Sequence, residues 1–199
     1  MSGATWPRAV FERLHMQRAD PWGVGTRAYE RDKYNQTMAV LAGRHFRFVL
    51  ELGCSIGVMT ARLARQADHV LAVDVAQAAL LRARHRCAGL PGVSFHRGQL
   101  PGGFPALLPE TCDLIVISEL LYFLSPVDIG RLARHCLRVR QPGGLIVLVN
   151  WTGPTDTPST GNTAARHFMT RCIAAGLRVT QTCRHLRYRV DVLTDAAAP

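Results

Sequence analysis

The sequence predicts a single α/β domain, in which a seven-stranded and mostly parallel sheet carries helices on both faces and ends in an antiparallel hairpin. Three observations support this prediction. An apolar strand at 46–52 runs through a glycine turn into a helix, further apolar strands alternate with helical segments up to residue 150, and two alternating strands follow at 177–183 and 187–193. With 199 residues, 48% of them hydrophobic, the chain has enough material for one sizeable core.

We expect three parts: an N-terminal helical cap at 1–44, the main domain at 45–193 and a frayed tail at 194–199. Apolar residues around positions 10–14 predict a short first helix in the cap, and a second helix spans about 26–42. The aromatic residues Trp22, Tyr29 and Tyr34 have two interpretations. They pack the cap on the core, or they line an acceptor site and bind substrate.

The chain carries a formal net charge of +10, and its positive residues are nearly all arginines, with Lys33 as the only lysine. This charge indicates either an arginine-biased, solvated surface or an electrostatic footprint for a polyanion. Basic runs with interleaved aromatic residues, which are typical of single-strand binding, are absent from the sequence. We therefore favour the solvated surface, and nucleic acid is not an expected partner.

The six cysteines stand far apart, with no C-x-x-C and no cluster with histidine at metal-ligand spacing, so no metal site is expected. No apolar run approaches the length of a membrane span, and the first residues, MSGATWPRAVF, lack an apolar signal core. We therefore expect a protein of the reducing cytoplasm that does not associate with membranes.

The segment ELGCSIG at 51–57 is the turn on which the chain depends. Gly53 and Gly57 remove Cβ atoms where a ligand or a neighbouring strand comes close, and the following helix start presents free N–H groups. The next apolar strand, 69–73, ends in Asp74, whose carboxylate can accept hydrogen bonds from both hydroxyls of a ribose. Together these signals predict a nucleoside cofactor.

The turn also discriminates between cofactors. A dinucleotide needs G-x-G-x-x-G to hold its pyrophosphate, and this turn has only the outer glycines with Glu51 before them. An acid there suits a ligand with a cationic amino group and no phosphate, which describes S-adenosylmethionine. The predicted cofactor-binding residues are Glu51, Gly53, Cys54, Ser55, Gly57, Asp74, Val75, Gln99, Leu100 and Glu119.

The most apolar strand of the second half, 113–118, ends in Glu119, and Tyr122 follows shortly after. Because parallel sheets bind ligands at the carboxyl ends of their strands, these two residues should face the same crevice as Asp74. Ser125 with Pro126 predicts a helix start. A fifth strand at 145–150 leads into a long polar loop at 151–162, so Asn150 and Trp151 are further candidates for the substrate site.

Several stretches resemble the NodS-like family of class I methyltransferases: DPW from residue 20, YER and KY within 29–34, ELGCSIGVMTARLA from 51, ISELLYFLSP from 117 and YRVDV from 188. Ser55 stands where the usual first motif of class I methyltransferases, E/D-x-G-x-G-x-G, has its central glycine. The resemblance implies a Rossmann-like methyltransferase fold. It also implies N-methylation, from S-adenosylmethionine, of the free amine on the deacetylated end sugar of a chitooligosaccharide.

The resemblance also implies roles for individual residues. Gln99 stands where these methyltransferases usually carry an Asp that accepts from the adenine amino group. Glu119 is expected to orient the acceptor amine and take up its proton, with Tyr122 as helper, or else only to accept hydrogen bonds. S-Adenosylhomocysteine is the expected product. Three alternatives remain: another small acceptor, including one methylated on oxygen; an RNA or protein acceptor; and a cofactor-binding module without catalysis.

Overall fold

The structure is a computed structural model that describes residues 3–195. One seven-stranded sheet has the strand order β3-β2-β1-β4-β5-β7-β6. Its strands are β1 (Phe46–Leu52), β2 (Ala67–Asp74), β3 (Val93–Arg97), β4 (Cys112–Ser118), β5 (Arg140–Trp151), β6 (Leu177–Arg184) and β7 (Tyr188–Asp195). Strands β1 to β5 pair in parallel, whereas β7 is antiparallel to both β5 and β6, which confirms the predicted sheet with its closing hairpin.

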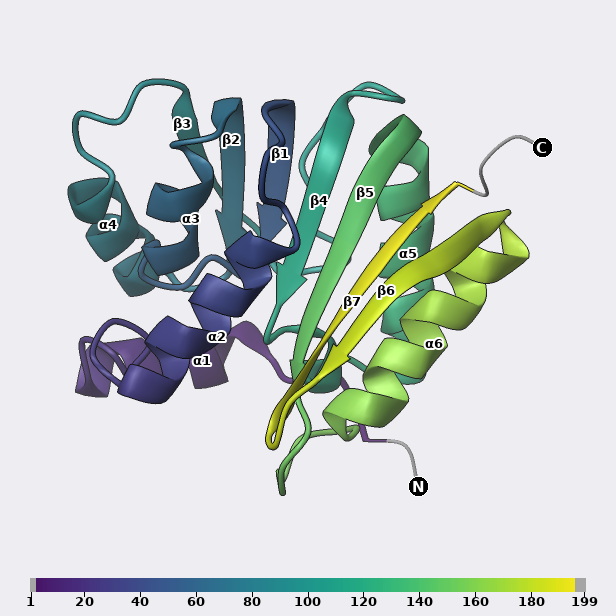
Figure 1. Ribbon diagram of the computed structural model, residues 1–199. Coiled ribbons are helices and arrows are strands. Elements are labelled where there is room, and N and C mark those ends of the chain that lie inside the picture. Colours follow the sequence, from purple (N-terminus) through teal and green to yellow (C-terminus); the bar gives the residue numbers. More distant parts are fainter. Residues whose placement is uncertain (1–2, 196–199) are drawn as a thin grey trace.

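Helices cover both faces of this sheet (Figure 1). They are α1 (Arg8–Gln17), α2 (Ala28–Ala39), α3 (Val58–Leu63), α4 (Gln77–Arg86), α5 (Pro126–Val139) and α6 (Gly161–Ala174), with a short 3₁₀ helix η1 (Leu121–Phe123). Figure 1 shows α1 and α2 at the end of the sheet toward which the β4 arrow points, which is its carboxyl edge.

Strand alternation divides the core into two layers, because successive side chains of a strand face opposite sides. Leu50 and Ile117 belong to the layer that α5 and α6 cover, where Phe168 is fully buried. Val49 and Val116 belong to the opposite layer, which α2 and α3 cover. Within residues 3–195, no helix is both long enough and apolar enough to cross a lipid bilayer.

The start of α5 has the predicted form. Ser125 is its N-cap, and the Ser125 hydroxyl accepts from the backbone N–H of Asp128 at 3.2 Å, with Pro126 in the first helical position. The start of α6 lies earlier than expected, at Gly161, because the Thr160 hydroxyl caps it by accepting from the N–H of Thr163.

The end of the chain differs from the expected frayed tail at 194–199. Strand β7 continues through Asp195, because that carboxylate accepts from both terminal nitrogens of Arg140, at 2.6 and 3.1 Å, and from the N–H of Gly143. Thr194 and Asp195 therefore belong to the sheet, two residues beyond the expected domain end at 193. The rest of the expected tail, 196–199, lies outside the described residues.

Two glycines with the same backbone conformation provide a test of helix packing. Gly57 has φ +78° and its added Cβ would lie 2.9 Å from Ala83 Cβ of α4, whereas Gly43 has φ +75° with nothing within 4 Å. We expect Gly43→Ala to lower the free energy of unfolding by about 1 kcal/mol, the cost of the left-handed conformation alone. Gly57→Ala should cost about 1 to 3 kcal/mol more because α3 and α4 must separate. Urea titration of both variants measures the difference, and equal losses would contradict the packing role of Gly57.

Candidate active site

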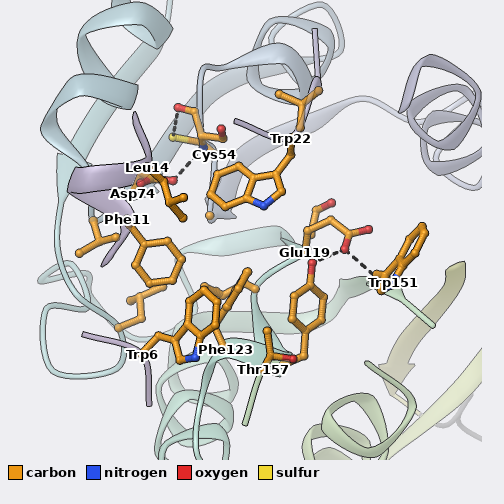
Figure 2. A pocket seen from close by; sticks show the side chains of 18 of the residues that line it. Trp6, Phe11, Leu14, Trp22, Cys54, Asp74, Glu119, Phe123, Trp151 and Thr157 are labelled. Atoms are coloured by element: carbon orange, nitrogen blue, oxygen red, sulfur yellow. Dashed lines mark hydrogen bonds between the residues drawn. The ribbon is translucent and has the colours of Figure 1, made fainter. Parts of the chain in front are cut away.

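A cavity of about 480 Å³ lies at the carboxyl edge of the sheet, which is within the usual size range of small-molecule sites. Its walls come from the N-terminal segment, from the ends of β1 and β2, and from the loops after β3, β4 and β5. Figure 2 shows Asp74 and Glu119 among these walls, with the rings of Trp6, Phe11, Trp22 and Phe123 around the space between them.

The turn after β1 is held by Asp74 at the end of β2. The Asp74 carboxylate accepts from the N–H of Ser55 at 2.8 Å with Oδ2 and from the N–H of Ala76 at 2.9 Å with Oδ1. Burial raises the pKa of Asp74, and these backbone hydrogen bonds oppose the rise. Gly53 has φ +86° and Ser55 has φ +50°. Ser55 thus adopts a left-handed conformation that favours glycine, as expected for the residue that replaces the central glycine of the methyltransferase motif.

Glu51 lies beneath this turn and is only 2% exposed. The Thr60 hydroxyl of α3 donates to Glu51 Oε2 at 2.6 Å. Burial raises the pKa of Glu51 to about 7, against the effect of the Thr60 hydrogen bond. Glu51 therefore changes charge near neutral pH within the wall of the cavity.

The structure brings most of the predicted cofactor residues together in the cavity wall: Glu51, Gly53, Cys54, Ser55, Asp74, Val75, Gln99, Leu100 and Glu119. Gly57 is the predicted cofactor residue that does not line the cavity; an added Cβ there would meet Ala83 of α4. The glycine signal was correct, but here it serves contact between two helices.

The N-terminal segment forms a wall of the cavity, as expected for a helical lid over the cofactor mouth, but through residues that the sequence did not single out. Trp6, Phe11, Leu14 and His15 line the cavity, and the only sequence signal for them is the apolar face of the short first helix. Gln99 Oε1 accepts from the N–H of Arg8 at 3.2 Å, and its Nε2 lies 3.5 Å from the Trp6 carbonyl oxygen. The amide predicted to meet an adenine is thus also a tether for this segment.

A buried charged cluster lies at the other end of the cavity, around Glu119. Its Oε1 accepts from Lys33 Nζ at 2.8 Å, and its Oε2 accepts from the Tyr122 hydroxyl at 2.5 Å and from the N–H of Trp151 at 3.1 Å. Glu119 has φ +54°, and its own N–H donates to the Val149 carbonyl oxygen. Burial and the adjacent Glu119 carboxylate raise the pKa of Tyr122, so its hydroxyl stays protonated.

Lys33 and Glu30 of α2 were missed as site residues. Lys33 Nζ lies 2.8 Å from Glu30 Oε2, and both side chains line the cavity although they are nearly buried. The available signal was that Lys33 is the only lysine in an arginine-rich chain, three residues after an acid.

The predicted substrate residues divide into two groups. Trp22, Tyr34 and Trp151 line the cavity. Tyr29 does not, because its ring packs edge-on behind Trp151 and against Tyr188, with ring centroids 5.8 and 5.7 Å apart. Asn150 does not line the cavity either: it is fully buried, because adjacent residues of a strand face opposite sides and Trp151 takes the cavity side.

Among residues 3–195, no group of three or more histidine, cysteine, aspartate or glutamate side chains is arranged to hold a metal ion. The described cysteines are free, and five of the six are buried. The titratable side chains in the cavity wall are those of His15, Arg27, Glu30, Lys33, Tyr34, Glu51, Cys54, Asp74, Glu119, Tyr122 and Asp156.

The fold and the site define the class of protein first. A mostly parallel sheet with this strand order, with an acid at the end of β2 and a ligand-sized cavity at its carboxyl edge, is a Rossmann-like nucleoside-binding architecture. Within that class, the sequence model of the nodulation protein S (NodS) family matches residues 8–140. The chain belongs to the NodS family, as the sequence resemblance predicted.

Individual proteins agree with this assignment. Nodulation protein S of Rhizobium tropici is 32% identical over 130 residues, which cover 64% of this chain and 53% of that protein. A phosphoethanolamine N-methyltransferase of Triticum aestivum is 28% identical over 123 residues, covering 61% of this chain and 24% of that protein. The chain thus spans about half the length of the nodulation protein that it matches, and a smaller part of the plant enzyme.

Among solved structures, the N-methyltransferase NodS from Bradyrhizobium japonicum WM9, in complex with S-adenosyl-L-homocysteine, has the same fold. The TM-score is 0.77 at 21% identity, and the match covers 94% of this chain and 97% of that one. The predicted class I methyltransferase fold is thereby confirmed.

The raised pKa of Glu51 gives a testable pH dependence of stability. Between pH 4.5, its ordinary value, and about 7, the folded protein holds a proton that the unfolded chain has released. Stability relative to Glu51→Gln should therefore fall as pH rises through this window, by about 1 to 3 kcal/mol. Denaturant titrations of both proteins from pH 5 to 8 measure it, and parallel profiles would show that Glu51 does not titrate there.

Proposed function

We propose that this protein is an S-adenosylmethionine-dependent methyltransferase that methylates a free amine on an amino sugar or a chitooligosaccharide-like molecule. One observation carries the proposal: Asp74, a candidate acceptor for ribose hydroxyls, and the hydrogen-bonded carboxylate of Glu119 line the same cavity of about 480 Å³. Membership of the NodS family supports the sugar amine. The plant relative named as an N-methyltransferase of phosphoethanolamine supports amine acceptors more generally.

The residues at the β1 and β2 ends fit the cofactor. Each Asp74 oxygen accepts one backbone N–H, which leaves acceptor positions for the two ribose hydroxyls. Glu51 supplies the acid for the cationic amino group, and Gln99 with Leu100 lies where the adenine would be received. When bound, S-adenosylmethionine supplies a methyl group already activated on a sulfonium, and S-adenosylhomocysteine is the product.

The work left to the protein is positioning. Glu119 orients the amine, and the side chains of Trp22 and Trp151 exclude water and offer faces on which a sugar ring can stack. The amine must be neutral to attack, in line and about 3 Å from the methyl carbon. Tyr122 fixes the Glu119 carboxylate through its hydroxyl. No covalent intermediate with the protein is required.

The affinity for S-adenosylmethionine tests the proposed role of Asp74 in binding the cofactor. Asp74→Ala should weaken S-adenosylmethionine binding by about 30-fold or more, because a charged acceptor of two hydrogen bonds is lost. Asp74 also holds the Ser55 turn, so Asp74→Asn, which retains one acceptor oxygen, is the matched variant. Isothermal calorimetry with the folded variants measures both affinities, and unchanged binding in Asp74→Ala would remove Asp74 from the site.

Acceptor turnover tests the rest of the proposal. Mass spectrometry should detect N-methylation when wild-type protein and S-adenosylmethionine are incubated with glucosamine or partly deacetylated chitooligosaccharides. N-Acetylated sugars, simple alcohols and tRNA are the comparison acceptors. In Glu119→Gln, kcat should fall by about 100-fold, because the charge that orients the amine is lost, while cofactor affinity is retained. Methylation of alcohols or tRNA alone would replace the proposal, and full kcat in Glu119→Gln would limit Glu119 to a structural role.

A further inference from the structure

Lys33 occupies a position that is unusual for lysine, whose side chain is normally exposed. It is the only lysine of the chain, it is 2% exposed, and its Nζ lies 2.8 Å from Glu30 Oε2 and 2.8 Å from Glu119 Oε1. The Tyr29 ring lies beside it, with the centroid 5.3 Å from Nζ. The cluster borders the cavity, because both carboxylates and the ammonium belong to its wall.

We propose that Lys33 is a positioning residue for the methyl acceptor: its buried ammonium holds Glu119 so that one acceptor position of Oε1 is left for an amine N–H. This inference rests on the proposed function and adds the residue on α2 that sets the geometry and charge of the acceptor end.

The hydrogen bonds of Glu119 carry the first step. A carboxylate offers about four acceptor positions, two on each oxygen. The Tyr122 hydroxyl and the Trp151 N–H take both positions of Oε2, and Lys33 takes one of Oε1. One position is left on Oε1. That position can orient one N–H, but it is a poor destination for a proton that must leave completely, as it must from an alcohol.

The charge of the cluster carries the second step. Glu30 and Glu119 provide two carboxylates against the single ammonium of Lys33, so the formal sum is one negative charge. Burial lowers the pKa of Lys33, but the Glu119 and Glu30 carboxylates raise it by more, so the ammonium stays charged. Further charged or titratable groups lie around the cluster: Arg27 beside Glu30, Arg187 beside Tyr29, Glu51 and Asp20 near Tyr34, Asp32 near Tyr188, and the hydroxyls of Tyr29, Tyr34, Tyr122 and Tyr188.

This charge matches the reaction of an amine. The nitrogen lone pair forms a bond to the methyl carbon, the carbon–sulfur bond breaks, and its electron pair stays on sulfur. The positive charge thereby moves from sulfur to the nitrogen of an N-methylammonium, which releases its proton to water after the transfer. The Glu119 carboxylate next to that nitrogen favours the transition state more than the neutral amine.

The variants Lys33→Met, Lys33→Arg and Glu30→Gln separate positioning from mere stability. Without the ammonium, no positive charge separates the Glu30 and Glu119 carboxylates, so one of them should take up a proton at a higher pH than in the wild type. In Lys33→Met we expect kcat/KM for the acceptor amine to fall by 30-fold or more at pH 7. In the pH profile of kcat/KM, the midpoint of the rise on the acid side (the acid limb) should move up by one pH unit or more. S-Adenosylhomocysteine affinity should stay within threefold. Lys33→Arg should restore the position of the acid limb, and Glu30→Gln should leave it near that of the wild type.

A readout without turnover keeps this inference separate from the proposed function. Protein labelled with ¹³C-lysine has a single lysine side-chain signal, because the sequence contains one lysine. Its titration midpoint should lie above that of free lysine and fall by one pH unit or more in Glu119→Gln. Glu12→Gln is the control, because Glu12 pairs with Arg97 instead.

An equal Lys33 titration midpoint in Glu119→Gln and Glu12→Gln would overturn the coupling between Lys33 and Glu119. An unchanged pH profile of kcat/KM in active Lys33→Met would overturn the positioning role. Absence of any amine turnover by the wild type, with the coupling intact, would count against the proposed function alone.

Discussion

The parallel pairing of β1 with β4 in the middle of the sheet is the constraint on which the site depends. It is here that the strand order reverses, from β2 and β3 on one side to β5, β7 and β6 on the other. Glu51 pairs in register with Val116, so the carboxyl ends of the two strands reach the same edge. The loops that leave β1 and β4 must diverge there, and a crevice opens between them. The Ser55 turn and Glu119 come together for this reason alone.

A second element, the N-terminal segment, turns this open crevice into a walled cavity. The Thr5 hydroxyl donates to Asp128 at 2.6 Å, the Trp6 N–H donates to the Phe123 carbonyl oxygen, and Glu12 accepts from Arg97 and from the N–H of Gln77. These contacts join the segment to the end of β3, to η1 and to the starts of α4 and α5. The carboxyl edge of the sheet therefore forms one side of the cavity. Residues outside the sheet close the cavity and supply aromatic side chains to its wall.

The sequence allowed the sheet and one half of the site to be predicted for a physical reason. Glu51, Ser55 and Asp74 stand directly at strand ends, where topology alone determines their surroundings. Asn150 lies outside the cavity wall, which could not be foreseen because a sequence pattern does not show which of two adjacent strand residues faces the cavity. Gly57 also lies outside it, and the same glycine signal marks close approach of a helix as well as of a ligand.

Lys33 could not be predicted because its partner Glu119 lies 86 residues away and is reached only through the packing of α2. Local patterns describe strands and turns, whereas an ion pair between distant elements depends on how those elements dock. The buried pair is costly in solvation unless further hydrogen bonds complete it. Here Tyr122 and the N–H of Trp151 supply them.

The two ends of the cavity share one further property. Ser55 and Glu119 are not glycines, yet both adopt left-handed backbone conformations, with φ +50° and +54°. Such residues cost about 1 to 3 kcal/mol each and persist only where surrounding contacts hold them. Asp74 holds the first, and the Val149 carbonyl oxygen, Lys33 and the other donors to the Glu119 carboxylate hold the second. Glu110 has a similar φ of +56° outside the cavity wall, so the conformation alone does not mark the site. What distinguishes Ser55 and Glu119 is that their strained backbones aim a turn and a carboxylate at the same space.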